Sequence, residues 1–154
     1  MEQQQEQVDS NKPKIHPIQL IDVKVRRLHV DLLRPVTENV EVDIKNFTFS
    51  HSHSKYNEET KTFIVMASAE IGIDDNGEII ESEDNIVAMR VDIAGFFKVD
   101  EEKFPKQHVE TFAERNAPLI VYPFLREQTY GLLSKAGING VVLPLFHIQP
   151  IKFN

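Results

Sequence analysis

The chain has 154 residues and a mass of 17.7 kDa, the size of one ordinary domain. It has no cysteine, which excludes a disulfide framework, a thiolate zinc site and a thiol nucleophile, and its net charge of −7 disfavours a nucleic-acid partner. No stretch is apolar for long enough to span a membrane and no apolar signal segment opens the chain, so we expect a cytoplasmic protein without membrane insertion.

Residues 1–14 contain almost nothing that could be buried. Glutamines flanked by glutamates cannot offset the entropy lost when a chain is ordered, so we predict a disordered leader over residues 1–14. The rest of the sequence has no internal repeat and no flexible linker. We therefore expect a single domain over residues 15–154.

Four segments alternate between apolar and polar side chains, which is the pattern of a half-buried strand. They cover residues 18–30, 40–49, 63–71 and 87–93. The apolar positions change parity at Arg26–Arg27, which predicts a β-bulge there. The polar run 51–60 predicts a hairpin connection, and Asp75-Asn76-Gly77 predicts a tight turn. Four such strands in series favour an antiparallel sheet with one wet face.

The pattern becomes helical after Val99. Asp100 can cap a first helix, although Pro105 moves its regular start to that position, and Asn116-Ala117-Pro118 interrupts it. A longer helix follows, in which Pro123 either opens the helix or kinks it. Strands followed by helices predict an α+β fold, here a four-stranded antiparallel sheet followed by two helices.

The end of the chain carries its own signals. Gly137 suits the left-handed position that follows the second helix. The apolar stretch from Val141 to Ile148 contains Pro144, which disfavours an inner strand. We therefore expect this stretch to be extended without joining the centre of the sheet.

The sequence contains none of the common catalytic or cofactor motifs. It has no G-x-S-x-G nucleophile elbow, no G-x-G-x-x-G fingerprint, no Walker loop and only six glycines. The acidic pairs Asp74/Asp75 and Glu81/Glu83 lie in turn-like segments and are interpreted as exposed charge. We expect no enzymatic activity and no cofactor.

One pair of side chains could hold a metal ion or a small ligand. His51 and His53 lie two positions apart in the polar run, so in an extended segment both imidazoles would point to one side, with Glu58 and Glu59 nearby. We favour two solvated loop histidines and expect no metal. The alternative is a small-molecule or metal-binding α+β domain that uses this loop.

Large apolar side chains are more numerous than one sheet and two helices can easily cover. The adjacent Phe96 and Phe97 face opposite ways if extended, and Ile64 and Met66 make the third strand apolar on both faces. Apolar surface on both faces predicts self-association, binding of apolar ligands, or both. Ordinary packing in a core or a subunit interface is the alternative for each of these residues.

The segment 116–127, NAPLIVYPFLRE, resembles the motif that opens the long helix of the SecB protein-export chaperones. The similarity continues through Leu132–Gly137 and, more loosely, through Leu143–Ile148, so its motifs are specific over residues 116–148. Upstream, Met89–Val99 is similar to the last strand of that family, which ends in glycine and aromatic residues. The order of four strands and two helices is also similar.

The resemblance implies an ATP-independent holdase. Such a chaperone is a homotetramer, built as a dimer of dimers, and binds unfolded or preprotein chains in apolar grooves during protein export. Nine residues are expected to line a groove or an interface: Phe47, Phe49, Phe63, Val65, Phe96, Phe97, Tyr122, Phe124 and Leu125. Pro123, Arg126 and Glu127 are expected to be structural, with Pro123 at the helix opening and Arg126 reaching a carboxylate across a subunit contact.

Two departures from the family pattern make the motor ATPase SecA a doubtful partner. The family docks SecA through acidic residues on the outer sheet face, but Arg26 and Arg27 lie where those acids are expected and Asp31 is the nearest candidate. The family's acidic C-terminal tail has no counterpart before Asn154. A divergent relative could serve another client, such as an antitoxin, or could be an oligomer whose apolar surface is fully buried between subunits.

Overall fold

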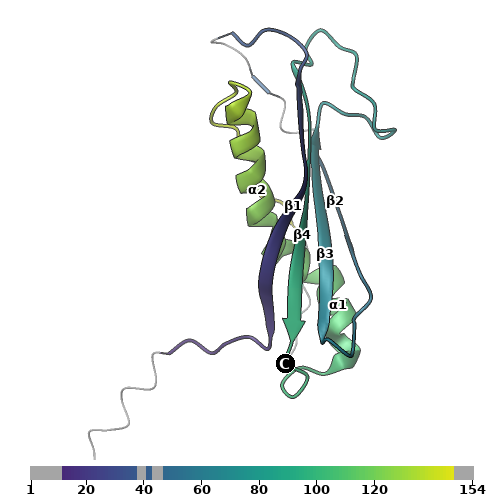
Figure 1. The fold of residues 1–154 in the computed structure, drawn as a ribbon. Coiled ribbons are helices and arrows are strands. Elements are labelled where there is room, and N and C mark those ends of the chain that lie inside the picture. The colour runs from purple at the N-terminus through teal and green to yellow at the C-terminus, as the bar shows by residue number, and fades with distance from the viewer. Residues whose placement is uncertain (1–11, 38–40, 43–46, 148–154) are drawn as a thin grey trace, which may run out of the picture.

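A computed structural model describes residues 12–37, 41–42 and 47–147 of the chain. Within these residues, four antiparallel strands form one sheet, and helices cover one of its faces (Figure 1). The strands are β1 (Ile18–Leu32), β2 (Thr48–His53), β3 (Thr62–Ile71) and β4 (Val87–Val99). Their order across the sheet is β1-β4-β3-β2, so β1 and β2 are the edge strands. The predicted α+β fold is confirmed.

The second strand differs from its prediction. Val40 and Ile44 lie outside the described residues, as does most of the predicted leader, of which only 12–14 are described. β2 begins at Thr48 and includes His51 and His53, which were wrongly predicted to lie in a loop. The two histidines continue the alternation that begins with Phe49, because a half-buried edge strand accepts polar side chains on its inner face.

β1 is long and carries two irregularities. Its register against β4 shifts between Leu20 and Asp22 and again between Val25 and Arg27, and the second shift confirms the predicted bulge. Each bulge resets the alternation, so the unevenly spaced apolar residues of β1 all lie opposite core residues of β4 and share their face. These residues are Ile18, Leu20, Val23, Val25, Leu28, Val30 and Leu32.

The helical layer consists of a 3-10 turn η1 (Lys106–His108), α1 (Val109–Arg115) and α2 (Ala117–Lys135). The break predicted at Asn116 is confirmed, so α1 and α2 form one long, bent helix. Pro118 lies in the first turn of α2, whereas Pro123 lies inside the helix and does not open it. None of the described helices is both long and apolar enough to cross a membrane.

α2 approaches the sheet most closely at Gly95 of β4. A Cβ atom added there would lie 2.7 Å from Cγ2 of Val121, so the absence of a side chain allows this contact. Gly137 ends α2 with a φ of +86°, which confirms the predicted left-handed position. The core is therefore formed by the helix-facing side of the sheet and the inner face of α2.

Gly72 follows β3 in a conformation that leaves no room for a side chain. Its φ is +73°, and an added Cβ would lie 2.1 Å from the carbonyl oxygen of Val87, whereas Gly77 has a φ of +79° and nothing within 4 Å. We expect Gly72→Ala to lower the free energy of unfolding by about 3 kcal/mol. Gly77→Ala should cost about 1 kcal/mol, since only the backbone strain applies. Urea denaturation of both variants measures the difference, and equal losses would contradict the steric clash.

Candidate functional site

An aromatic cluster lies between the edge strand β2 and α2. The ring centroid of Phe49 lies 5.4 Å from that of Tyr122 and 5.0 Å from that of Phe146, and the Tyr122 and Phe146 centroids are 4.8 Å apart. Phe47 joins the cluster through Phe146, at 6.2 Å. Such tilted and edge-on contacts are favourable geometries for aromatic rings. The cluster therefore unites three distant segments of the chain.

The third of these segments is the C-terminal strap, which we define as residues 139–147. It contains no helix or strand. Leu143 is fully buried and Phe146 is partly buried against the core, whereas Val142 and Leu145 are 46% and 77% exposed. The strap therefore contacts the protein through two apolar side chains and presents the others to solvent.

Two side chains of α2 hold the main chain of the strap. Arg126 Nε donates a hydrogen bond to the carbonyl oxygen of Leu143 at 3.0 Å, and the Tyr122 hydroxyl donates to the carbonyl oxygen of Pro144. Burial raises the pKa of Tyr122, while the neighbouring Arg126 opposes that change, so the hydroxyl stays protonated and remains a donor. The Arg126 guanidinium also lies 5.9 Å from the centre of the Tyr122 ring. Arg126 thus has a partner within its own chain.

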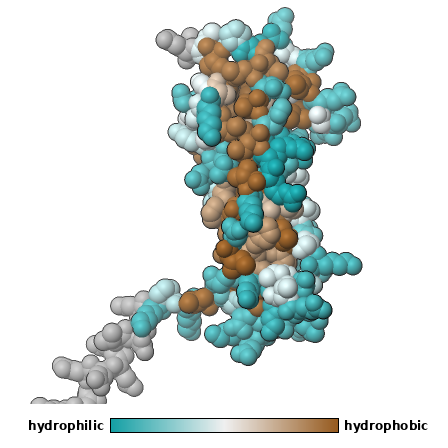
Figure 2. All heavy atoms as spheres, in the orientation of Figure 1, coloured by the Kyte–Doolittle hydropathy of each residue, from teal (hydrophilic) through white to brown (hydrophobic). Residues whose placement is uncertain are grey.

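A second apolar region lies along the other edge of the sheet, between β1 and the helices. Two clefts of about 560 and 420 Å³ share Leu20 as a lining residue. In the smaller cleft, Ile21, Val25 and Phe124 are 56%, 43% and 39% exposed. Figure 2 shows a stripe of hydrophobic residues running lengthwise over this side of the molecule. Among the described residues β1 pairs only with β4, so its outer edge adjoins this apolar region, which is typical of an interaction surface.

The residues predicted for a groove or an interface fall into several places. Four of them are at most 1% exposed and belong to the core: Phe63, Val65, Phe97 and Leu125. The rings of Phe63 and Phe97 stack there with centroids 4.9 Å apart, because both strands turn these positions toward the helices. The other five lie outside this core cluster: Phe47, Phe49 and Tyr122 in the aromatic cluster, Phe124 in the β1 cleft, and Phe96 on the opposite face of the sheet.

Two residues of the aromatic site were not among the predicted set. Leu143 and Phe146 belong to the loosely matching end of the family resemblance, where the sequence shows an apolar stretch but no regular period. Their role depends on α2, which supplies the donors for the neighbouring carbonyl groups. Of the predicted structural residues, Pro123 and Glu127 are exposed on α2.

His51 and His53 point to the helix-facing side of β2, opposite Ala67 and Val65 of β3. His53 Nε2 lies 3.2 Å from a carboxylate oxygen of Glu114 on α1, which links the edge strand to the helices. Nδ1 of His51 is buried without a hydrogen-bond partner among the described residues, and its ring lies 5.7 Å from that of Phe49. Over the same residues, no group of three or more His, Cys, Asp or Glu side chains could hold a metal ion.

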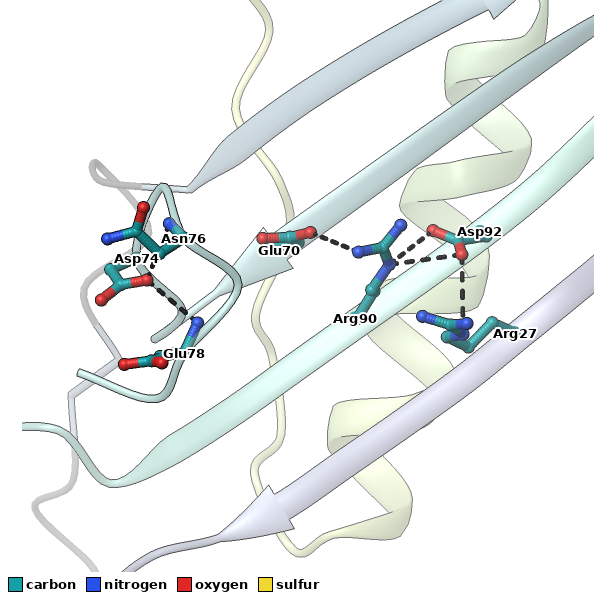
Figure 3. A network of polar contacts seen from close by, with 7 residues as sticks. All are labelled: Arg27, Glu70, Asp74, Asn76, Glu78, Arg90 and Asp92. Carbon is teal, nitrogen blue, oxygen red and sulfur yellow. Dashed lines mark hydrogen bonds and ion pairs between the residues drawn. The ribbon is translucent and has the colours of Figure 1, made fainter. Parts of the chain in front are cut away.

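The face of the sheet opposite the helices carries a polar network (Figure 3). Arg90 contacts Glu70 at 3.0 Å and Asp92 at 3.1 Å, and Arg27 lies 3.8 Å from Asp92. The two acids are therefore neutralised by two arginines from the neighbouring strands. Close by, the Asp74 carboxylate accepts two backbone hydrogen bonds, at 2.9 Å each, inside the connection that holds the predicted Asp75-Asn76-Gly77 turn.

A four-stranded antiparallel sheet backed by one long, bent helix defines a SecB-like fold. The solved structure of the Mycobacterium tuberculosis Rv1957 SecB-like chaperone, in complex with a ChAD peptide from the Rv1956 HigA1 antitoxin, matches this chain with a TM-score of 0.63. The two sequences are 13% identical, and the match covers 84% of this chain and 91% of that chain. The resemblance predicted from the sequence is thus confirmed as a likeness of fold.

A protein of unknown function from Streptococcus agalactiae is less similar, with a TM-score of 0.39 and 18% identity over 83% of this chain and 97% of that chain. No protein-family model matches the sequence, and no curated protein matches it significantly.

Proposed function

We propose that the protein is an ATP-independent holdase chaperone that binds unfolded or preprotein chains at the aromatic cluster. One observation carries the proposal: this site holds an extended polypeptide, the C-terminal strap, through two main-chain carbonyl groups and two apolar side chains. Carbonyl groups occur in every chain, and apolar side chains are what an unfolded chain exposes, so a site of this kind accepts many sequences. The similar fold of Rv1957, which is described as a chaperone bound to a peptide, supports the proposal.

Binding needs no nucleotide because it follows mass action. Each large apolar side chain removed from water contributes about 1.5–3 kcal/mol, so two anchors together give a useful affinity for an exposed segment. A partner that binds the unfolded state but not the native state delays folding in proportion to its concentration. Phe47, Phe49 and Tyr122 are the predicted groove residues that we propose contact the client, and Phe96 offers a further apolar contact on the outer face.

We propose that a second copy of the chain covers the β1 cleft. A strand of 15 residues with an unpaired edge and exposed apolar side chains aggregates unless something covers it. A two-fold contact that places the same surfaces of two protomers together would bury Ile21, Val25 and Phe124 at once. Two such dimers would form the homotetramer that the family resemblance implies.

SecA is not part of the proposal. The acidic residues on the outer face are paired with Arg90 and Arg27, so this face offers no excess of negative charge to a basic partner. The protein would then retain cytoplasmic clients without delivering them to that motor.

A refolding assay tests the holdase proposal. A slowly folding preprotein is diluted out of denaturant with and without this protein, in the absence of ATP. We expect refolding to be delayed at equimolar protein, and we expect no binding to the same preprotein once it has folded. Unchanged refolding at a several-fold molar excess would contradict the proposal.

A further inference from the structure

We infer that the C-terminal strap is a displaceable internal occupant of the aromatic cluster, and that a client binds by taking the place of Leu143 and Phe146. The inference rests on the proposed function, because it concerns the same site. It assigns the class of ligand: an extended apolar segment in which an aliphatic residue is followed three positions later by an aromatic one. The strap itself has this pattern in Leu143-Pro144-Leu145-Phe146.

The strap is attached by few contacts. No backbone–backbone hydrogen bond joins residues 139–147 to any other part of the chain that the structure describes, whereas β2 pairs with β3 along its whole length. The polar contacts of the strap are the two hydrogen bonds from Arg126 and Tyr122, and both donors belong to α2. A segment held in this way opens at a much smaller free energy than the sheet beneath it.

The recognised atoms of the strap are carbonyl oxygens. Pro144 has no N–H group and therefore cannot pair as an inner strand, yet its carbonyl oxygen accepts the hydrogen bond from Tyr122. Arg126 and Tyr122 act only as donors to the strap, so the site requires no N–H group from its occupant. It can hold a client segment that contains proline, which strand addition to a sheet edge would reject.

The side chains of the strap separate what is bound from what is free. Leu143 is buried and Phe146 contacts Phe47, Phe49 and Tyr122, while Leu145 between them is 77% exposed. The two anchors therefore set the spacing, and the residue between them tolerates any side chain. When no client is present, the strap shields the aromatic rings from water and from other molecules.

Competition between strap and client determines the apparent affinity. If the strap is closed in about nine of ten molecules, a client binds about tenfold more weakly than it would bind the open site. Any change that removes the anchors of the strap should therefore strengthen the binding of a peptide supplied in solution.

Strap variants test this directly. L143S/F146S removes both anchors, and V142S/L145S changes the same segment at its exposed positions as a matched control. A fluorescent peptide with the sequence of residues 139–147 should bind L143S/F146S about tenfold more tightly than it binds the wild type or the control. Equal binding to all three proteins, or binding to none, would overturn the inference.

A second measurement does not depend on that double variant. Because the chain has no cysteine, Leu145→Cys provides a single site for a spin label. The label should become more mobile when unfolded, carboxymethylated α-lactalbumin binds, and unchanged mobility with this client bound would overturn the inference. Tyr122→Phe keeps the ring and removes the donor to Pro144, so it should strengthen peptide binding about threefold, and weaker binding by the folded variant would count against the strap.

The two proposals fail separately. A wild-type protein that does not delay refolding, while the peptide still binds L143S/F146S more tightly, would refute the holdase and leave the strap mechanism standing. A wild-type protein that delays refolding, while the peptide binds every variant equally, would refute the strap mechanism alone.

Discussion

Replacing Phe49 by serine is expected to weaken the binding of unfolded chains about fiftyfold. Phe49 lies at the centre of the aromatic cluster, with its ring 5.4 Å from that of Tyr122 and 5.0 Å from that of Phe146. Aromatic residues at the centre of a binding site contribute about 2 kcal/mol or more, which corresponds to the expected loss. Fluorescence anisotropy with a labelled, permanently unfolded client measures the dissociation constant.

Ser50→Ala is the matched control for Phe49→Ser. Ser50 is the next residue of β2, but it pairs with Ser68 and therefore faces away from the helices. It should bind clients as the wild type does, and both variants should keep the wild-type circular dichroism spectrum. A folded Phe49→Ser protein with undiminished affinity would show that clients bind elsewhere.

Replacing Val25 by aspartate is expected to separate the protomers. Val25 is 43% exposed on the helix-facing side of β1 and lines the same cleft as Phe124. In a two-fold contact each substitution introduces two carboxylates, and burying an unpaired charge costs several kcal/mol. The dissociation constant of the assembly should therefore rise at least about 100-fold. Sedimentation velocity over a range of concentrations measures the change in mass.

Lys24→Asp places the same side chain one position earlier, opposite Ala94 and therefore on the other face of β1. It should leave the assembly intact. The separated Val25→Asp protomers should still bind the labelled client, because the aromatic cluster lies at the opposite edge of the sheet. A Val25→Asp protein with the mass of the wild-type assembly would exclude the β1 cleft as the interface.

Several features were predictable because they depend on neighbours in the sequence. The alternation of apolar residues located the strands, the change of parity at Arg26–Arg27 revealed one bulge, and Asn116-Ala117-Pro118 revealed the break between the helices. The bulge at Ile21 escaped notice because the polar residue that follows it restores a plausible alternation. His51 and His53 were misplaced because polarity was taken as evidence for a loop, although an edge strand tolerates it.

The sequence by itself determined the order and type of the elements, because periodicity and helix breaks are properties of short segments. Only the tertiary structure decided which aromatic residues meet. It buried Phe63 and Phe97 in the core, left Phe124 in an open cleft and brought Phe49 together with Phe146 across most of the chain. The physical reason is that the surroundings of a side chain depend on strand pairing and on the face that α2 covers, and both arise from contacts between distant segments.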